Sequence, residues 1–208
     1  MGIHIEALIL FILIFLSGSS ADGGFSAKTE LVKIFMFYIP SIALIWHIIL
    51  NAGKTNLWIF RFGKKDITAG LVTFPCLLIT GFAVALSANI TGGQASGQLA
   101  AGSPSTVFDW TALCISCIAF AYLEESYFRF YILTNRESLN LNVVSALALS
   151  AALFSICHIS GGPWSFLNAA IGGTILGFMF LRYNSFHGIA IAHSMYNIAV
   201  YIINSRIN

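Results

Sequence analysis

Charged residues are scarce in this 208-residue chain, at 9% of the total, and only eight of them are acidic. A water-soluble domain usually carries about 25% charged residues. The hydrophobic fraction is 58% and the mean hydropathy is +0.85, so apolar residues take the place of the missing charges. The formal net charge of +2 is too small to indicate a nucleic-acid partner. The composition predicts a protein that is surrounded by membrane lipid.

Cysteine is also rare, with four residues, and all of them lie within apolar stretches: Cys76, Cys114, Cys117 and Cys157. Such positions fit neither a disulfide scaffold nor an exposed thiol. Cys114 and Cys117 have C-x-x-C spacing, but a redox pair needs an accessible thiol, which the middle of a membrane helix does not offer. We interpret the cysteines as packing residues.

Long linkers, repeats and low-complexity tracts are absent, which predicts a single domain over residues 1–208. A membrane-spanning helix needs about 20 mostly apolar residues. Six segments approach that length, at 31–50, 67–88, 108–134, 141–159, 164–182 and 187–204. A shorter one, residues 5–16, fits either a span or the apolar part of a signal peptide, and we favour a span because no Lys or Arg precedes it. The predicted fold class is all-α, a polytopic transmembrane helix bundle of about seven spans.

Lys and Arg in short loops predict the orientation, because they are enriched on the cytoplasmic side. The loop between the second and third spans contains Lys54, Arg61, Lys64 and Lys65, whereas the loop 89–107 contains none. We therefore expect the first of these loops to be cytoplasmic.

Two of the eight acidic residues, Glu124 and Glu125, lie inside the fourth predicted span. A central ionised residue costs roughly 2.5 to 3.5 kcal/mol on insertion scales, and such residues usually mark function. Glu125 and Arg129 are four residues apart on one helical face and can form an ion pair. Glu124 points about 100° away around the helix and is free for another role, such as a general base. The structural alternative is a buried network that only fixes helix packing.

Two further spans contain histidines at helical spacing. Phe154 lies one turn before His158, and His193 lies one turn before Asn197, so an imidazole and a carboxamide share a face. Each histidine taken alone is more simply explained as a packing residue that is hydrogen-bonded to a neighbouring helix. The combination with Glu124 favours a polar intramembrane cavity that contains a functional site.

The three motifs together resemble the CAAX protease and bacteriocin-processing (CPBP, or Abi) family. They are Glu-Glu-x-x-x-Arg at Glu124, Glu125 and Arg129, Phe-x-x-x-His at Phe154 and His158, and His-x-x-x-Asn at His193 and Asn197. All three occur in order within residues 108–204, and the first hundred residues match the family in hydropathy alone.

This resemblance implies an intramembrane glutamate-dependent endopeptidase without a metal or cofactor. Glu124 and His158 would activate a water, His193 and Asn197 would stabilise the oxyanion, and Glu125 with Arg129 would support them. The implied substrate is a membrane-associated peptide or protein, either lipid-modified or a leader peptide. The implied location is the bacterial plasma membrane. The resemblance identifies no particular substrate.

The depth of His158 conflicts with a shared site. At 1.5 Å per residue, Glu124 and His193 lie roughly 10 to 15 Å from the cytoplasmic ends of their spans, but His158 lies roughly 25 Å deep if its span begins at Leu141. Either a fourth span that projects beyond the membrane, or a fifth that starts late and ends at the Gly161-Gly162-Pro163 break, would restore the match.

Three other functions remain open. One glutamate and two histidines also form a hydrolytic zinc ligand set, although no H-E-x-x-H motif is present. A proton-coupled transporter is disfavoured because the polar residues crowd into the C-terminal half instead of occurring in paired repeats. A membrane protein that binds a peptide without cutting it, such as an immunity protein, would carry the same groups.

Overall fold

The computed structural model describes residues 2–16, 25–51, 61–93 and 104–207. Within these residues it is helical and contains no strand, which confirms the predicted all-α class. Two parts of the orientation prediction lie outside the described part of the chain. They are Lys54, and residues 94–103 of the loop 89–107.

Seven helical rods account for the described residues, and three of them change helix type along their length. The rods are α1 (Gly2–Phe11) with η1 (Ile12–Leu16); α2 (Ala27–Lys33) with η2 (Ile34–Tyr38) and α3 (Ile39–Asn51); α4 (Lys64–Ile90); α5 (Val107–Glu125) with η4 (Ser126–Tyr131) and α6 (Ile132–Thr134); α7 (Val143–Ile156); α8 (Pro163–Tyr183); and α9 (Phe186–Ile207). A short 3₁₀ turn, η5 (Ile159–Gly161), joins α7 to α8.

Five of these rods are long and apolar enough to cross a membrane, and α1–η1 and α7 are shorter apolar helices. The number of helices agrees with the predicted polytopic bundle. The fifth predicted span, 141–159, is shorter in the structure, because α7 has 14 residues. It therefore has a length of about 21 Å, which is less than the roughly 30 Å of a hydrocarbon core.

The helix ends follow local sequence signals. Thr106 caps α5 by accepting a hydrogen bond from the amide of Asp109, whose carboxylate accepts one from the amide of Thr106 in return. Asn142 caps α7 through the amide of Ser145. The chain leaves α8 at Asn184, which has a left-handed φ of 48°. The last two helices are therefore joined by a tight turn.

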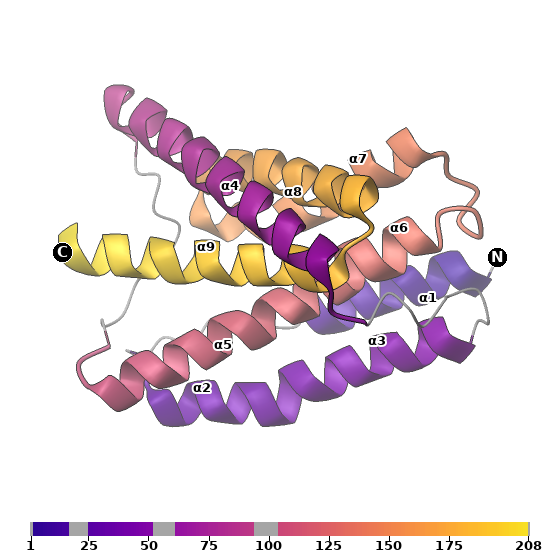
Figure 1. Cartoon of the computed structure of the whole chain (residues 1–208), viewed down its shortest axis with the longest axis horizontal. Helices are drawn as coiled ribbons and strands as arrows, with labels where there is room; N and C mark the ends of the chain where they lie inside the picture. The colour runs from indigo at the N-terminus through magenta and orange to yellow at the C-terminus, as the bar shows by residue number, and fades with distance from the viewer. Residues whose placement is uncertain (1, 17–24, 52–60, 94–103, 208) are drawn as a thin grey trace.

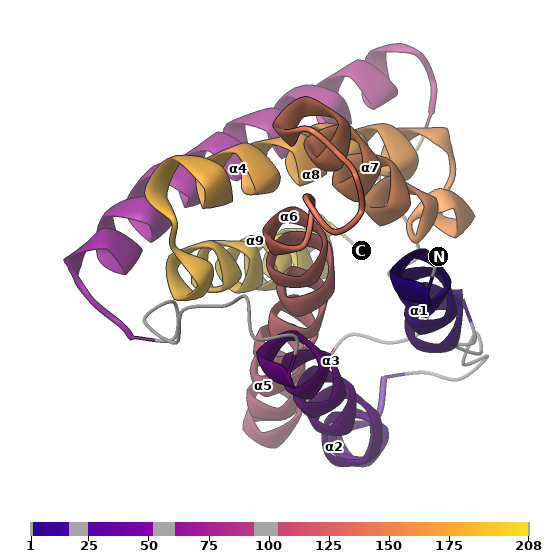
Figure 2. The same ribbon diagram turned by 90° about the vertical axis from the view of Figure 1, so that its right-hand side faces the viewer.

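The helix α9 runs through the middle of the bundle, between α4 and α5 (Figure 1). The end view shows α6 near the middle, with α7 and α8 on one side of it and α2–α3 on another (Figure 2). The six residues of η4 are all buried, and they include Arg129 and four aromatic side chains. The most enclosed part of the bundle therefore directly follows Glu124 and Glu125.

The N-terminal helix packs against this enclosed segment. The Tyr127 hydroxyl donates a hydrogen bond of 2.7 Å to the backbone oxygen of Ala7. The ring centroid of Phe15 lies 4.8 Å from that of Phe128 and 5.4 Å from that of Tyr127. The segment 5–16, which we predicted as a span, is thus a helix of the bundle.

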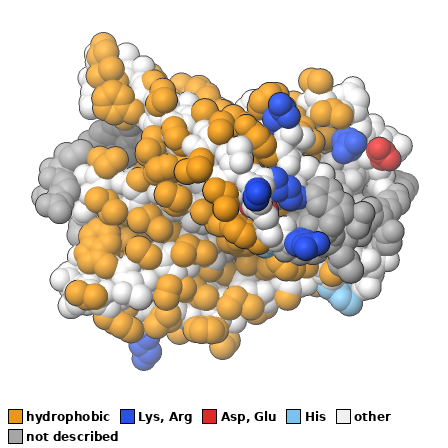
Figure 3. All heavy atoms as spheres, in the orientation of Figure 1, with side chains coloured by type: hydrophobic (Ala, Val, Ile, Leu, Met, Phe, Trp, Pro, Cys, Tyr) orange, Lys and Arg blue, Asp and Glu red, His pale blue; other side chains and the backbone are white. Residues whose placement is uncertain are grey.

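Positive side chains gather at one end of the bundle. In the space-filling view most of the visible Lys and Arg side chains lie in the half where α4 begins (Figure 3). The Lys65 ammonium donates a 2.7 Å hydrogen bond to the backbone oxygen of Asn184, so the start of α4 and the α8–α9 turn lie at the same end. This arrangement agrees with the alternation of spans that the sequence predicts.

Candidate active site

Glu124 and Glu125 are the last residues of α5, where the helix passes into the π-helical η4. Their exposures are 1% and 0%. A π-helical turn inside an α-helix is rare and frequently occurs at functional sites. Two adjacent buried carboxylates before such a turn mark this part of the fourth span as unusual for a membrane helix.

Arg129 forms the predicted ion pair with Glu125, with 3.1 Å between Nη1 and Oε1 and both side chains fully buried. Its Nη2 donates a hydrogen bond of 3.2 Å to the backbone oxygen of Gly173 on α8. Its Cζ atom lies 4.6 Å from the ring centroid of Phe154 on α7, within range of a cation–π contact. The guanidinium therefore ties three helices together.

His193, on α9, lies between the two glutamates. Its Nδ1 is 2.8 Å from Oε1 of Glu125, and its Nε2 is 3.6 Å from Oε2 of Glu124. The same oxygen of Glu125 thus faces both His193 and Arg129. The sequence predicted the contact within the helix but not the one across helices, because helical spacing carries no information about a partner on another helix.

His158 lies just beyond the end of α7 and is half-buried. Its Nδ1 lies 2.9 Å from the backbone oxygen of Phe154, and the two ring centroids are 4.7 Å apart. The Phe154 ring is also 5.7 Å from the ring of His193. Phe154 therefore contacts both imidazoles and the Arg129 guanidinium.

The register between α7 and η4 accounts for the depth of His158. The Ser150 hydroxyl donates a 2.7 Å hydrogen bond to the backbone oxygen of Phe128, so these residues lie at one level. One turn further along the antiparallel helices, Phe154 reaches the level of Glu124, and the His158 side chain turns back toward Phe154. The helix begins at Val143, two residues after Leu141, and a 3₁₀ turn lies between its end and Pro163.

Asn197 lies one turn after His193 on α9 and is half-buried. Among the described residues it has no hydrogen-bond partner. Glu124, Glu125, Arg129 and His193 thus form one connected cluster. His158 joins the cluster through Phe154. Asn197 lies one helical turn after His193 and forms no hydrogen bond with the described residues of the cluster.

The two carboxylates differ in their hydrogen bonding. Oε1 of Glu124 is buried and has no hydrogen-bond partner within the described part of the chain, and neither has Oε2 of Glu125. Glu125 is nevertheless held by His193 and Arg129 through its other oxygen, whereas the closest charged partner of Glu124 lies at 3.6 Å. Nε of Arg129 is likewise buried without a hydrogen-bond partner there, so Glu124 differs from Glu125 in lacking a close ion pair and not in having an unpaired oxygen.

Metal binding was an open alternative for these residues. In the part of the chain that the structure describes, no group of three or more His, Cys, Asp or Glu side chains has an arrangement that could hold a metal ion.

Buried carboxylates, imidazoles and a guanidinium inside a bundle of apolar helices define an integral membrane protein with a polar intramembrane site. The model of one family, the type II CAAX prenyl endopeptidase Rce1-like proteins, matches residues 106–199. The predicted relation to the CPBP/CAAX protease family is thereby confirmed for this region, which contains all three motifs. No significant match is found among curated proteins or among solved structures.

Proposed function

We propose that this protein is an intramembrane endopeptidase that hydrolyses a peptide bond of a membrane-associated substrate, with Glu124 and His158 activating the attacking water. The family relation supports a CAAX-type membrane protease. The observation that carries the assignment of the base is the buried Oε1 of Glu124, an acceptor without a partner among the described residues, on a carboxylate whose other oxygen lies 3.6 Å from Nε2 of His193. A general base has to hold such an accepting position ready for a proton.

His158 is set up to accept a proton or to orient a water. A backbone carbonyl can only accept hydrogen bonds, so the contact with Phe154 places the His158 proton on Nδ1. Nε2 of the neutral ring then carries the free lone pair. In the proposed step the water oxygen bonds to the peptide carbonyl carbon, Glu124 takes the water proton, and this proton passes to the leaving amine as the C–N bond breaks.

His193 and Asn197 are proposed to stabilise the oxyanion that develops on the carbonyl oxygen. The Glu125 carboxylate accepts the Nδ1–H of His193, which leaves Nε2 on the side of Glu124. Nε2 can donate to an oxyanion only when the ring carries both protons. In that form the positive charges of His193 and Arg129 balance the negative charges of the two glutamates. The doubly protonated His193 ring is therefore the state that both the oxyanion role and a cluster without net charge require.

The substrate class that we propose is a prenylated or otherwise lipid-modified peptide, or a leader peptide, in the plasma membrane of a bacterium. The family name supports the first of these substrates, because it denotes endopeptidases that act on prenylated C-termini. A metal has no part in the proposal, so peptidase activity should survive exhaustive chelation. Loss of activity on chelation, restored by zinc, would favour a zinc-dependent hydrolase.

Replacing Glu124 with Gln tests the assignment. The amide has nearly the same shape but cannot take up the proton, and the loss of a general base typically lowers the rate about 10² to 10⁴-fold. We expect Glu124→Gln to accumulate to the parental level and to lose kcat on a prenylated peptide by that factor. Glu137→Gln is the matched control, because the Glu137 side chain is 85% exposed at the end of the bundle.

Parental turnover by Glu124→Gln would contradict the proposal. No turnover by the parent, together with a peptide-binding phenotype that Glu124→Gln keeps, would replace the peptidase with a non-catalytic binding protein.

A further inference from the structure

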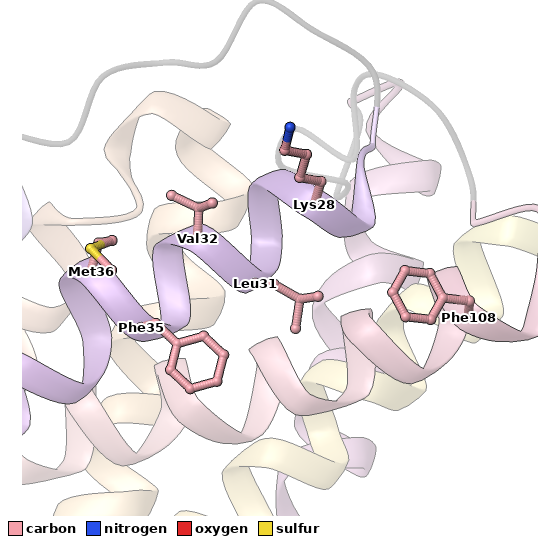
Figure 4. A pocket seen from close by; sticks show the side chains of 6 residues that line it. All are labelled: Lys28, Leu31, Val32, Phe35, Met36 and Phe108. Atoms are coloured by element: carbon pink, nitrogen blue, oxygen red, sulfur yellow. The ribbon is translucent and has the colours of Figure 1, made fainter.

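A second feature of the molecule lies far from the site described above. A groove of about 430 Å³ runs between the α2–η2 rod and the start of α5 (Figure 4). It is lined by Lys28, Leu31, Val32, Phe35, Met36 and Phe108. Phe108 and Glu124 are 16 positions apart, which corresponds to about 24 Å along the helix. None of the lining residues belongs to the cluster around Glu124.

The groove has the layout of an amphiphile. Its single charged residue, Lys28, lies at the start of α2, and every other lining residue is apolar. Met36 is eight positions beyond Lys28, which places it about 12 Å further along the helix. In the close view Leu31 and Phe108 point toward each other across the groove, while the Lys28 ammonium points away from them (Figure 4). A cation at the start of α2 and an apolar wall along the next 12 Å match a lipid headgroup and its chain.

The groove opens toward the membrane. Val32, Phe35 and Met36 have exposures of 52%, 61% and 74%, which in a membrane protein means contact with lipid. The ligand that reaches such a groove first is a membrane lipid.

The charge of Lys28 is available to a ligand. Lys28 is exposed and forms no ion pair or hydrogen bond with the described residues. Lys33, on the same helix, instead lies 2.7 Å from Glu30. Glu30 is thus engaged, and it also accepts a hydrogen bond from Ser116. A lysine without a partner in the lining of an apolar groove favours an anionic headgroup over a neutral one.

The acidic residue next to Phe108 does not cancel this charge. Asp109 accepts hydrogen bonds from the amide and hydroxyl groups of Ser105 and Thr106. Its carboxylate also lies in the first turn of α5, where the positive end of the helix dipole offsets it.

We propose that this groove is a binding site for one anionic phospholipid, with an acyl chain along Leu31, Phe35 and Phe108 and the phosphate at Lys28. The lipid fills the gap between the α2–η2 rod and α5 and so holds the second rod of the bundle against the fourth. The proposal is independent of the peptidase assignment, because none of the lining residues belongs to the cluster around Glu124.

Lipid binding to the purified full-length chain tests the proposal. The chain is titrated in detergent with phosphatidylglycerol or with phosphatidylcholine, and the bound lipid is counted by native mass spectrometry. One lysine charge near an anionic headgroup contributes an affinity factor of about five. We expect Lys28→Gln to bind phosphatidylglycerol about five-fold more weakly and to bind phosphatidylcholine as the parent does. Lys28→Arg keeps the positive charge and should bind phosphatidylglycerol with the parental affinity.

Lys33→Gln is the matched control, because it removes a charge from the same helix that is already paired with Glu30. It should keep the parental preference for phosphatidylglycerol. Leu31→Trp places a large ring in the groove and should weaken the binding of phosphatidylglycerol without raising KM for a prenylated peptide. Thermal unfolding of each variant verifies that it is folded.

Three results would overturn the proposal. In the first, Lys28→Gln or Leu31→Trp binds phosphatidylglycerol as tightly as the parent does. In the second, the parent binds phosphatidylglycerol and phosphatidylcholine with equal affinity. In the third, Leu31→Trp has a raised KM for the prenylated peptide. The last result would make the groove a substrate site.

Discussion

Two neighbouring glutamates have different surroundings because their side chains point about 100° apart around the helix axis. Glu125 faces Arg129 one turn along its own helix and His193 across the bundle. Glu124 has no hydrogen-bond partner among the described residues and lies 3.6 Å from Nε2 of His193. One carboxylate is therefore fixed by two partners, and the other is left available.

This difference predicts a different outcome for Glu125→Gln than for Glu124→Gln. The Gln amide removes the negative charge that balances Arg129, and breaking a buried pair typically costs about 3–5 kcal/mol. We expect a clear fall in folded yield and in the unfolding temperature in detergent. The Gln carbonyl can still accept the Nδ1–H of His193, so the folded fraction should keep part of its kcat.

Yield, unfolding temperature and kcat per folded molecule are to be measured side by side for both variants. A Glu125→Gln protein as stable as the parent would mean that Arg129 does not depend on this charge. The assignment of Glu125 as a supporting residue would then be wrong.

At the scale of single residues, the sequence predicted contacts within a helix and missed those between helices. The Glu125–Arg129 pair follows from a spacing of four residues. The bond between His193 and Glu125, and the contacts of Phe154 with two imidazoles and a guanidinium, depend on how α5, α7 and α9 pack. Spacing within single helices does not contain that information.

At the scale of helices, apolar length predicted most elements and failed where packing sets the detail. The predicted segments 67–88, 164–182 and 187–204 correspond to α4, α8 and α9. The π-helical η4 was not predicted, since Ser126–Tyr131 contains no Gly or Pro to signal an irregular turn. The end of α7 at Ile156, three residues before the predicted end of the fifth span, was not predicted.

The close approach of α4 and α9 provides a test at this scale. A Cβ atom added to Gly188 would lie 2.9 Å from Cα of Asp66 and 2.6 Å from Oγ of Ser185, and would clash with the backbone oxygen of Asp66. Backbone atoms cannot give way, so the helices must separate. Overpacking of this kind typically costs about 1–3 kcal/mol. We expect Gly188→Ala to lower the unfolding temperature in detergent.

Gly172→Ala is the matched control on α8. Its added Cβ would meet only Cδ2 of Leu77, at 3.8 Å, an ordinary van der Waals contact. Alanine also favours a helix interior over glycine, so the unfolding temperature should stay at the parental value or rise. Equal losses in both variants would show that the α4–α9 contact is not tight.

At the scale of the whole molecule, charge is distributed unevenly between the two ends. The hydrogen bond between Lys65 and Asn184 joins the start of α4 to the α8–α9 turn, and alternation of seven predicted spans puts the loops before α4 and after α8 on one side of the membrane. Arg136 follows α6 and Arg182 lies in the last turn of α8, and both helices end near that side (Figure 1). Short loops rich in Lys and Arg are retained in the cytoplasm. The number and alternation of the helices could thus be predicted from hydropathy and charge, whereas the packing partners of each helix could not.

The direction of the bundle in the membrane remains a prediction that one cysteine can test. Gly63, just before α4, has no atom within 4 Å of an added Cβ and an extended φ of −161°, so Gly63→Cys should fold normally. In right-side-out membrane vesicles a membrane-impermeant maleimide should leave this cysteine unmodified until the vesicles are opened. Val107→Cys, 84% exposed at the start of α5 and at the opposite end of the bundle, should react at once. The parental chain is the control for its native cysteines, none of which is fully exposed. Immediate labelling of Gly63→Cys together with protection of Val107→Cys would reverse the orientation and place the lysine-rich end outside the cell.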